Sequence, residues 1–135
     1  MVSSLWNAPR PIGDFYITCV DFPHILETMI MTAVERFEAI LIGGTDSPSL
    51  RFALGAEYAK LKETSQAIDH LRSAVVQDPE FSAAWKLLGK VQVEAGLVEE
   101  AIDSYRKGIR VATQHGDIQA SREMKVFLKR LQNAN

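Results

Sequence analysis

Few side chains in this sequence stand at spacings that could support catalysis or metal binding. Cys19 and His24 are near enough to be two metal ligands, but two ligands alone are a weak pattern, so we expect an ordinary cysteine and a surface histidine. Asp69 directly precedes His70, and adjacent helical residues point in different directions. A solvated helix face is therefore expected there rather than a catalytic pair.

A group of carboxylates lies where a helix is expected to begin. Glu99, Glu100 and Asp103 fall within the first turns of that segment. Carboxylates are favoured there by the positive end of the helix dipole, which predicts a structural role rather than acid–base catalysis. The sequence also lacks glycine-rich phosphate loops, paired-histidine zinc motifs and nucleophile elbows. We therefore predict no enzymatic activity, no cofactor and no metal.

The composition is that of an ordinary globular domain. The chain has 135 residues, of which 47% are hydrophobic and 24% charged, with a formal net charge of −2. This charge gives no global attraction to nucleic acid or to an anionic membrane. A single cysteine suits a reducing compartment, and no apolar run reaches the ~18 residues of a membrane span. The start shows no basic stretch followed by an apolar one, so a cytoplasmic protein is expected.

The elements that would position any site come from an internal repeat with a period of 34 residues. Small and apolar positions coincide at this offset in the pairs Leu54 and Leu88, Gly55 and Gly89, Ala67 and Ala101, Leu71 and Tyr105, and Ala74 and Gly108. Two corresponding positions differ between the repeats. Arg51 in the first repeat corresponds to Trp85 in the second, and Gln92 in the second repeat corresponds to Tyr58 in the first.

This pattern resembles the tetratricopeptide repeat, a helix–turn–helix unit with the signature W-x2-L-G-x2-Y followed by small, aromatic and small residues and a proline. The resemblance implies an all-α fold, a short tetratricopeptide-type helical repeat array (an α-solenoid) of about six helices. It predicts a half repeat over 23–47, full repeats over 48–81 and 82–115, and a capping helix over 117–131. Residues 1–22 match no repeat position and are a disordered tail, a segment folded over the array, or a non-native extension.

The repeat also predicts how the helices pack. Gly89 lies one turn after Trp85, and the missing side chain would let a partner helix approach closely. Trp85 is expected in the core. In the half repeat, Ala33, Phe37 and Ile40 fall on the sites of Ala67, Leu71 and Ala74, and this face is expected to cover the first full repeat.

The resemblance further implies a concave face lined by the first helix of each repeat, with a protein or peptide partner bound in it. Position by position, the predicted groove residues are Phe52, Ala56, Lys60, Lys86, Lys90 and Glu94. One subgroup of the family grips a peptide's terminal carboxylate with lysine, asparagine and arginine. Its sites correspond here to Phe52, Ala56 and Leu87, so that arrangement is absent.

We therefore expect an adaptor or assembly factor that binds a partner protein. Two alternatives remain open. The array could be a structural module that associates with itself, because it is short and its ends are incompletely capped. It could also bind an acidic partner or, less favourably, RNA through the basic C-terminal helix, since residues 106–135 carry seven basic side chains against two acidic ones.

Overall fold

The computed structural model describes residues 33–134, and the helix ends in this range follow from local sequence chemistry. Residues 33–42 are helical, and the chain leaves the helix at Gly43 and at Gly44, whose φ of 101° suits glycine. Helix α3 (Pro48–Lys60) begins where the Ser47 hydroxyl accepts the Leu50 N–H at 3.2 Å. Proline stands in its first turn, where no N–H is needed.

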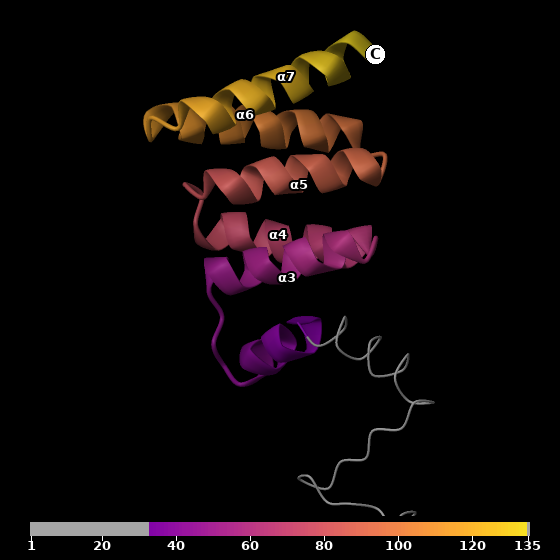
Figure 1. Cartoon of the computed structure of the whole chain (residues 1–135), viewed down its shortest axis with the longest axis vertical. Helices are drawn as coiled ribbons and strands as arrows, with labels where there is room; N and C mark the ends of the chain where they lie inside the picture. Colours follow the sequence, from indigo (N-terminus) through magenta and orange to yellow (C-terminus); the bar gives the residue numbers. More distant parts are fainter. Residues whose placement is uncertain (1–32, 135) are drawn as a thin grey trace, which may run out of the picture. The chain divides into compact units, whose positions relative to one another are not determined.

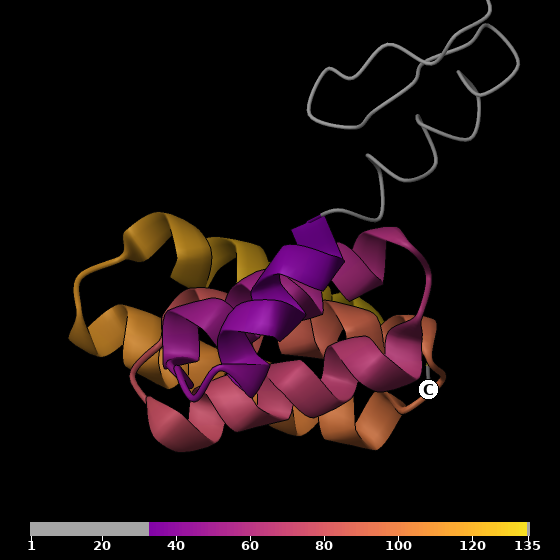
Figure 2. The ribbon, with the colours of Figure 1, turned by 90° about the horizontal axis from the view of Figure 1, so that it is seen from below.

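Four more helices follow: α4 (Thr64–Gln77), α5 (Ser82–Glu94), α6 (Val98–Gln114) and α7 (Ile118–Ala134). They stack in chain order from α3 to α7 (Figure 1), and the view from below looks along this stack (Figure 2). Residues 33–134 contain no strand, so the predicted all-α class with about six helices is confirmed. The predicted tail and the part of the half repeat before Ala33 lie outside the described residues.

The glycines inside the repeats mark the closest helix contacts. A Cβ on Gly55 would lie 2.5 Å from the Leu71 side chain, and a Cβ on Gly89 would lie 2.7 Å from the Tyr105 ring. Both pairs join the first helix of a repeat to the second, and they are related by the 34-residue offset. The predicted close approach is confirmed, and the space beside each glycine is filled by a side chain of the partner helix.

A second pair of positions explains why the repeats differ where Tyr58 is replaced by Gln92. The Tyr58 ring stacks on the His70 ring with centroids 5.4 Å apart. At the same place in the next repeat, the Ser104 hydroxyl donates to the Gln92 carbonyl oxygen at 2.6 Å, and both side chains are buried. The two positions therefore differ together between the repeats, as a ring pair in the first and a hydrogen-bonded pair in the second.

Two sequence predictions about packing hold only in part. Trp85 is only half-buried: its indole N–H donates to the Pro79 carbonyl oxygen at 2.8 Å, and Lys107 lies 5.4 Å from its ring centroid. In the half repeat, Phe37 packs on the core as predicted, together with Val34 and Leu41, but Ile40 is 47% exposed. In both cases the 34-residue register is right, but each position lies near the end of its helix, where neighbouring elements cover the side chain only in part.

The last helix, predicted as a capping helix, packs through a stripe of apolar side chains. Met124 is fully buried, and a Cβ on Gly108 would lie 2.6 Å from its sulfur. The other members of the stripe are partly buried around it: Ala120, Phe127, Leu128 and Leu131. The Asp117 carboxylate accepts the Ala120 N–H at 3.1 Å, which satisfies the beginning of the helix.

Candidate functional site

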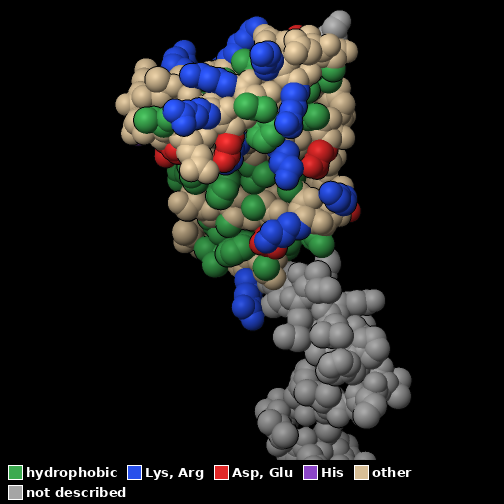
Figure 3. All heavy atoms as spheres, turned by 45° about the horizontal axis from the view of Figure 1, so that its top comes forward, with side chains coloured by type: hydrophobic (Ala, Val, Ile, Leu, Met, Phe, Trp, Pro, Cys, Tyr) green, Lys and Arg blue, Asp and Glu red, His purple; other side chains and the backbone are tan. Residues whose placement is uncertain are grey.

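Helices α3, α5 and α7, the first and every second helix of the stack, share one face of the molecule. Each of the outer two packs against α5. Two hollows follow α5 on this face, one on the side of α3 and one on the side of α7. We call the surface formed by these two hollows the groove. Figure 3 shows the molecule with α7 turned toward the viewer, where hydrophobic side chains lie between lysine and arginine side chains.

The hollow between α3 and α5 has a volume of about 360 Å³. Its floor is made of small and aliphatic side chains, and its rim carries charges. The lining residues are Ala56, Ala59, Lys60, Lys62, Leu87, Lys90, Val91 and Glu94. Lys60 pairs with Glu57 at 2.9 Å, whereas Lys62 and Lys90 take part in none of the ion pairs formed within residues 33–134. This hollow therefore has an apolar floor and uncompensated positive charge.

The hollow between α5 and α7 measures about 320 Å³ and is more apolar. It is lined by Lys90, Val93, Glu94, Tyr105, Phe127, Arg130 and Leu131. The Tyr105 and Phe127 rings lie with centroids 5.8 Å apart at its base. Burial raises the pKa of Tyr105 to about 12, so the phenol stays neutral at any physiological pH. Such a hollow can accept a large apolar side chain with a carboxylate near Arg130.

The structure places the predicted groove residues in three different settings. Ala56, Lys60, Lys90 and Glu94 line the first hollow together. Phe52 instead packs on Phe81, with ring centroids 5.0 Å apart, and is partly buried against the core. Lys86 donates to Glu123 of α7 at 2.8 Å, an interaction that lowers the pKa of this carboxyl group.

Two parts of the groove were missed by the sequence prediction. The side chains from α7, namely Phe127, Arg130 and Leu131, were assigned to a capping helix only. Lys62 was also missed, although a signal existed. It stands 34 residues before Gly96, and both residues have positive φ, 63° for Lys62 and 81° for Gly96.

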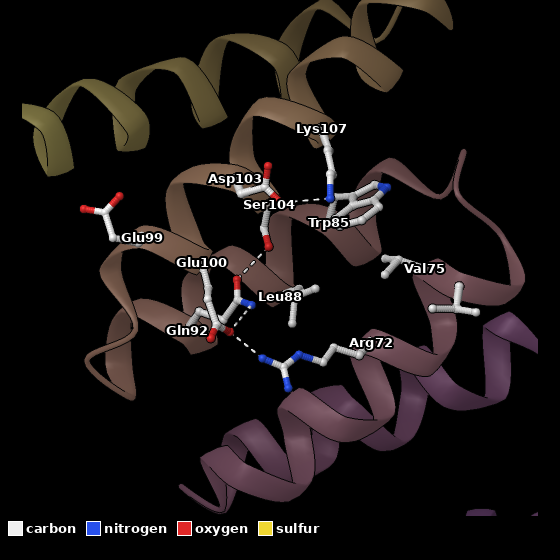
Figure 4. Close-up of a pocket in the computed structure, with 11 residues that line it drawn as sticks. Arg72, Val75, Trp85, Leu88, Gln92, Glu99, Glu100, Asp103, Ser104 and Lys107 are labelled. Atoms are coloured by element: carbon white, nitrogen blue, oxygen red, sulfur yellow. Dashed lines mark hydrogen bonds and ion pairs between the residues drawn. The ribbon is translucent and has the colours of Figure 1, made fainter.

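A third hollow, of about 500 Å³, lies between α4, α5 and α6 (Figure 4). Most of its polar side chains pair with one another. Ser104 donates to Gln92, the Gln92 amide lies 3.4 Å from Glu100, and Glu100 is paired with Arg72. Because these groups are already satisfied, this hollow is less suited to hold a polar ligand than the groove is.

Comparison with known proteins agrees with the repeat. A sequence profile described as tetratricopeptide repeat matches residues 48–91. A TPR repeat-containing protein of Pseudomonas aeruginosa is 43% identical over 101 residues, which span 75% of this chain and 96% of that protein. This chain belongs to the tetratricopeptide repeat family.

Solved structures agree with this assignment. A protein from Bordetella parapertussis, known from a solution structure, is 42% identical and superposes with a TM-score of 0.66 over 75% of this chain and 88% of that one. The TPR2B domain of yeast Sti1 is only 15% identical but has a TM-score of 0.72 over 84% of this chain and 90% of that one. The second similarity shows the fold alone.

In this tetratricopeptide array, the signature tryptophan of the first repeat is replaced by an arginine with polar contacts. The Arg51 guanidinium donates two hydrogen bonds to Asp46, at 2.9 and 2.7 Å, and its third nitrogen lies 3.2 Å from His70. Gln77 donates to the same carboxylate at 2.8 Å. The cluster therefore joins the loop before α3 to both helices of the repeat. Asp69 is exposed, and its side chain makes no hydrogen bond or ion pair with the cluster.

The hydrogen bonds from Arg51 and Gln77 lower the pKa of Asp46 to about 2. Because the pKa is lower in the folded than in the unfolded chain, the stabilisation is present above the ordinary carboxyl pKa, ~4, and is lost as pH falls toward 2. We expect Asp46→Ala to melt at a lower temperature than the parent at pH 7. The two melting temperatures should converge near pH 2.

Asp69→Ala is the matched control. Its melting temperature should equal that of the parent both at pH 7 and near pH 2. If Asp46→Ala melts below the parent by the same amount at both pH values, the charge of the Asp46 carboxylate is not the source of the stabilisation. His70 adds a separate pH effect. Burial and then Arg51 lower its pKa from 6.5, so protonation favours unfolding and all variants that keep His70 should lose stability as pH falls below ~6.5.

The described residues hold no group of three histidine, cysteine, aspartate or glutamate side chains arranged for a metal ion. Within the same range, no helix combines the length and the apolar character that crossing a membrane requires.

Proposed function

We propose that this tetratricopeptide protein acts as an adaptor or assembly factor, without catalysis, by binding an acidic segment of a partner protein in the groove. An apolar side chain of the segment enters the hollow between α5 and α7. A neighbouring carboxylate lies between Lys90 and Lys62. The proposal retains residues 23–135 as the array, and its partner-binding residues are those of the two hollows.

The observation that carries the proposal is the meeting of the two hollows along one helix. Lys90 and Glu94 line both hollows, and residues four apart on a helix are neighbours on its surface. One extended or helical segment can therefore contact both hollows at once. The groove carries Lys62, Lys90 and Arg130 without ion pairs among the described residues, against the single Glu94 on the shared ridge, which favours an acidic segment.

The related folds support peptide binding in general and narrow the chemistry. The Sti1 domain is described in a complex with pHsp70. In the present chain, the positions that would grip a terminal carboxylate hold Phe52, Ala56 and Leu87 instead of lysine and asparagine. We therefore infer an internal acidic segment rather than a free C-terminus as the ligand.

Lys62 offers a test that separates function from stability. A non-glycine residue in the left-handed conformation costs about 1 kcal/mol, and glycine removes that strain. We expect Lys62→Gly to raise the melting temperature and, at the same time, to weaken binding. Segments would first be selected from a random peptide display library on the intact chain, and their affinities then measured by calorimetry.

Further variants of the groove make the test specific. Lys90→Glu should weaken binding most at low salt, because exposed charges are screened beyond ~8–10 Å at physiological ionic strength. Phe127→Ala should weaken binding at all salt concentrations. Arg36→Glu, an exposed change in the helix over 33–42, is the control. Selected segments that bind all of these variants with parental affinity would place the binding site elsewhere.

A further inference from the structure

Helix α7 has a second exposed face, separate from the groove, that combines bases with aliphatic side chains. Ile118 is 62% exposed and Val126 49% exposed. Three exposed bases lie on the same side of the helix. Arg122 is four residues from both Ile118 and Val126, Lys129 is three residues after Val126, and Lys125 is three residues after Arg122 and four before Lys129. We call these five residues the outer face of α7. It is opposite the buried Met124 stripe.

The charges of the outer face are uncompensated. None of its three bases takes part in an ion pair formed within residues 33–134. The acidic residue of α7, Glu123, pairs with Lys86 on the groove side. Any partner that covers this face must therefore supply negative charge as well as apolar surface.

The packing of α5 indicates which kind of element covers a helix face in this fold. Helix α5 packs against α4 on one side and against α6 on the other, with α3 and α7 as further neighbours. Among the described residues, α7 packs only against α6 and α5. The outer face is a side of α7 on which no other helix of the described range packs. Rows of side chains three and four apart on one helix fit the grooves of another helix, so a helix can cover this surface.

We propose that the outer face of α7 binds an acidic amphipathic helix of a partner protein, which extends the helix stack by one member. Ile118 and Val126 lie two helical turns apart, about 12 Å along the axis. They contact the apolar stripe of the incoming helix, and the three bases pair with its flanking carboxylates. This mode is the laying of a helix along an apolar strip with charged edges.

Two other classes of ligand fit the surface less well. Single-stranded RNA is bound through aromatic side chains on which bases stack, and the outer face has none. A helix that lies on a membrane separates its apolar side from its basic side. In α7 the broad apolar side is buried on α6, and the exposed aliphatic residues are interspersed with the bases.

The test uses the intact chain and a short synthetic helical peptide with leucine and glutamate on one face, labelled for fluorescence anisotropy. We expect the peptide to bind the parent. Arg122→Glu with Lys125→Glu should weaken binding about tenfold, since each exposed charge pair contributes modestly. The same double variant should gain affinity for a peptide in which lysine replaces every glutamate. Arg106→Glu with Arg110→Glu, equal in charge and located on α6, should change neither affinity.

Replacing Ile118 and Val126 by serine should weaken the glutamate peptide at every salt concentration, because apolar burial is far less salt-sensitive than charge pairing. The proposal is overturned if the parent does not bind the peptide. It is also overturned if an oligouridine RNA or phosphatidylserine vesicles bind more tightly and ignore the serine changes. A dimer in sedimentation velocity that dissociates when Arg122→Glu and Lys125→Glu are combined would make a second copy the occupant and would equally overturn it.

Discussion

Gly89→Leu is expected to lower the free energy of unfolding by about 3 kcal/mol, the upper part of the range for overpacked cores. A Cβ at this position would already lie 2.7 Å from the Tyr105 ring, which is only 2% exposed and has no free space to move into. Leucine adds three more carbons in the same direction. Chemical denaturation monitored by circular dichroism measures the loss directly.

The partner of the contact provides the control. Tyr105→Ala leaves a cavity and should be destabilising by itself. Combined with Gly89→Leu, it should recover part of the loss, because the leucine fills the space that the ring occupied. If the two losses of unfolding free energy are additive in a double-mutant cycle, the effect of Gly89→Leu does not come from its contact with Tyr105.

The contact between Gly89 and its partner helix could be predicted from the sequence, because a close helix approach is the simplest explanation of a glycine inside a helix. A glycine inside a helix costs roughly 1 kcal/mol against alanine, so two glycines at the repeat period indicate close contacts. The buried positions at Ala67 and Ala101 follow from the same period. Within the repeats, therefore, the helix pairs and their contact residues could be predicted.

The groove could be predicted only in part, because one wall comes from a helix outside the repeat pattern. Helix α6 has 17 residues where α4 has 14, so the register that relates the two repeats does not continue into α7. The sequence predicts α7 as a capping helix, but it does not predict that Phe127 and Arg130 line the hollow beside α5. Tertiary placement of a capping helix cannot be obtained from periodicity alone.

Polar contacts between elements were also beyond the sequence. Lys86 was predicted as an exposed groove residue, and its pairing with Glu123 depends on how α7 lies against α5. Arg51 was recognised as a departure from the tryptophan site. Its carboxylate partner Asp46 comes from the preceding loop, whose path no repeat rule describes. Such contacts are set by side-chain geometry at the ends of elements.

Met124→Ala is expected to cost 2–5 kcal/mol, the usual range for truncating a buried methionine, but the loss should be confined to the C-terminal end of the stack. Met124 is fully buried and fills the space beside Gly108, so it fixes α7 on α6. In a repeat array each unit is stabilised mainly by its neighbours, and an end helix can therefore unfold alone. Amide hydrogen exchange in the native state distinguishes local unfolding of α7 from unfolding of the whole array. We expect protection to fall in α7 and in the adjoining part of α6, and to stay at the parental level in α3 and α4.

The same change links stability to the proposed function. When α7 detaches, the hollow that it forms with α5 loses Phe127 and Leu131, so a segment selected on the parent should bind Met124→Ala much more weakly. Val126→Ala on the exposed side of the same helix is the control, because it removes little buried surface and should preserve both protection and groove binding. A uniform loss of protection through all helices would contradict local unfolding and would mean that the array folds as one cooperative unit. If the segment still binds with parental affinity when α7 is detached, the hollow between α5 and α7 is not part of the binding site.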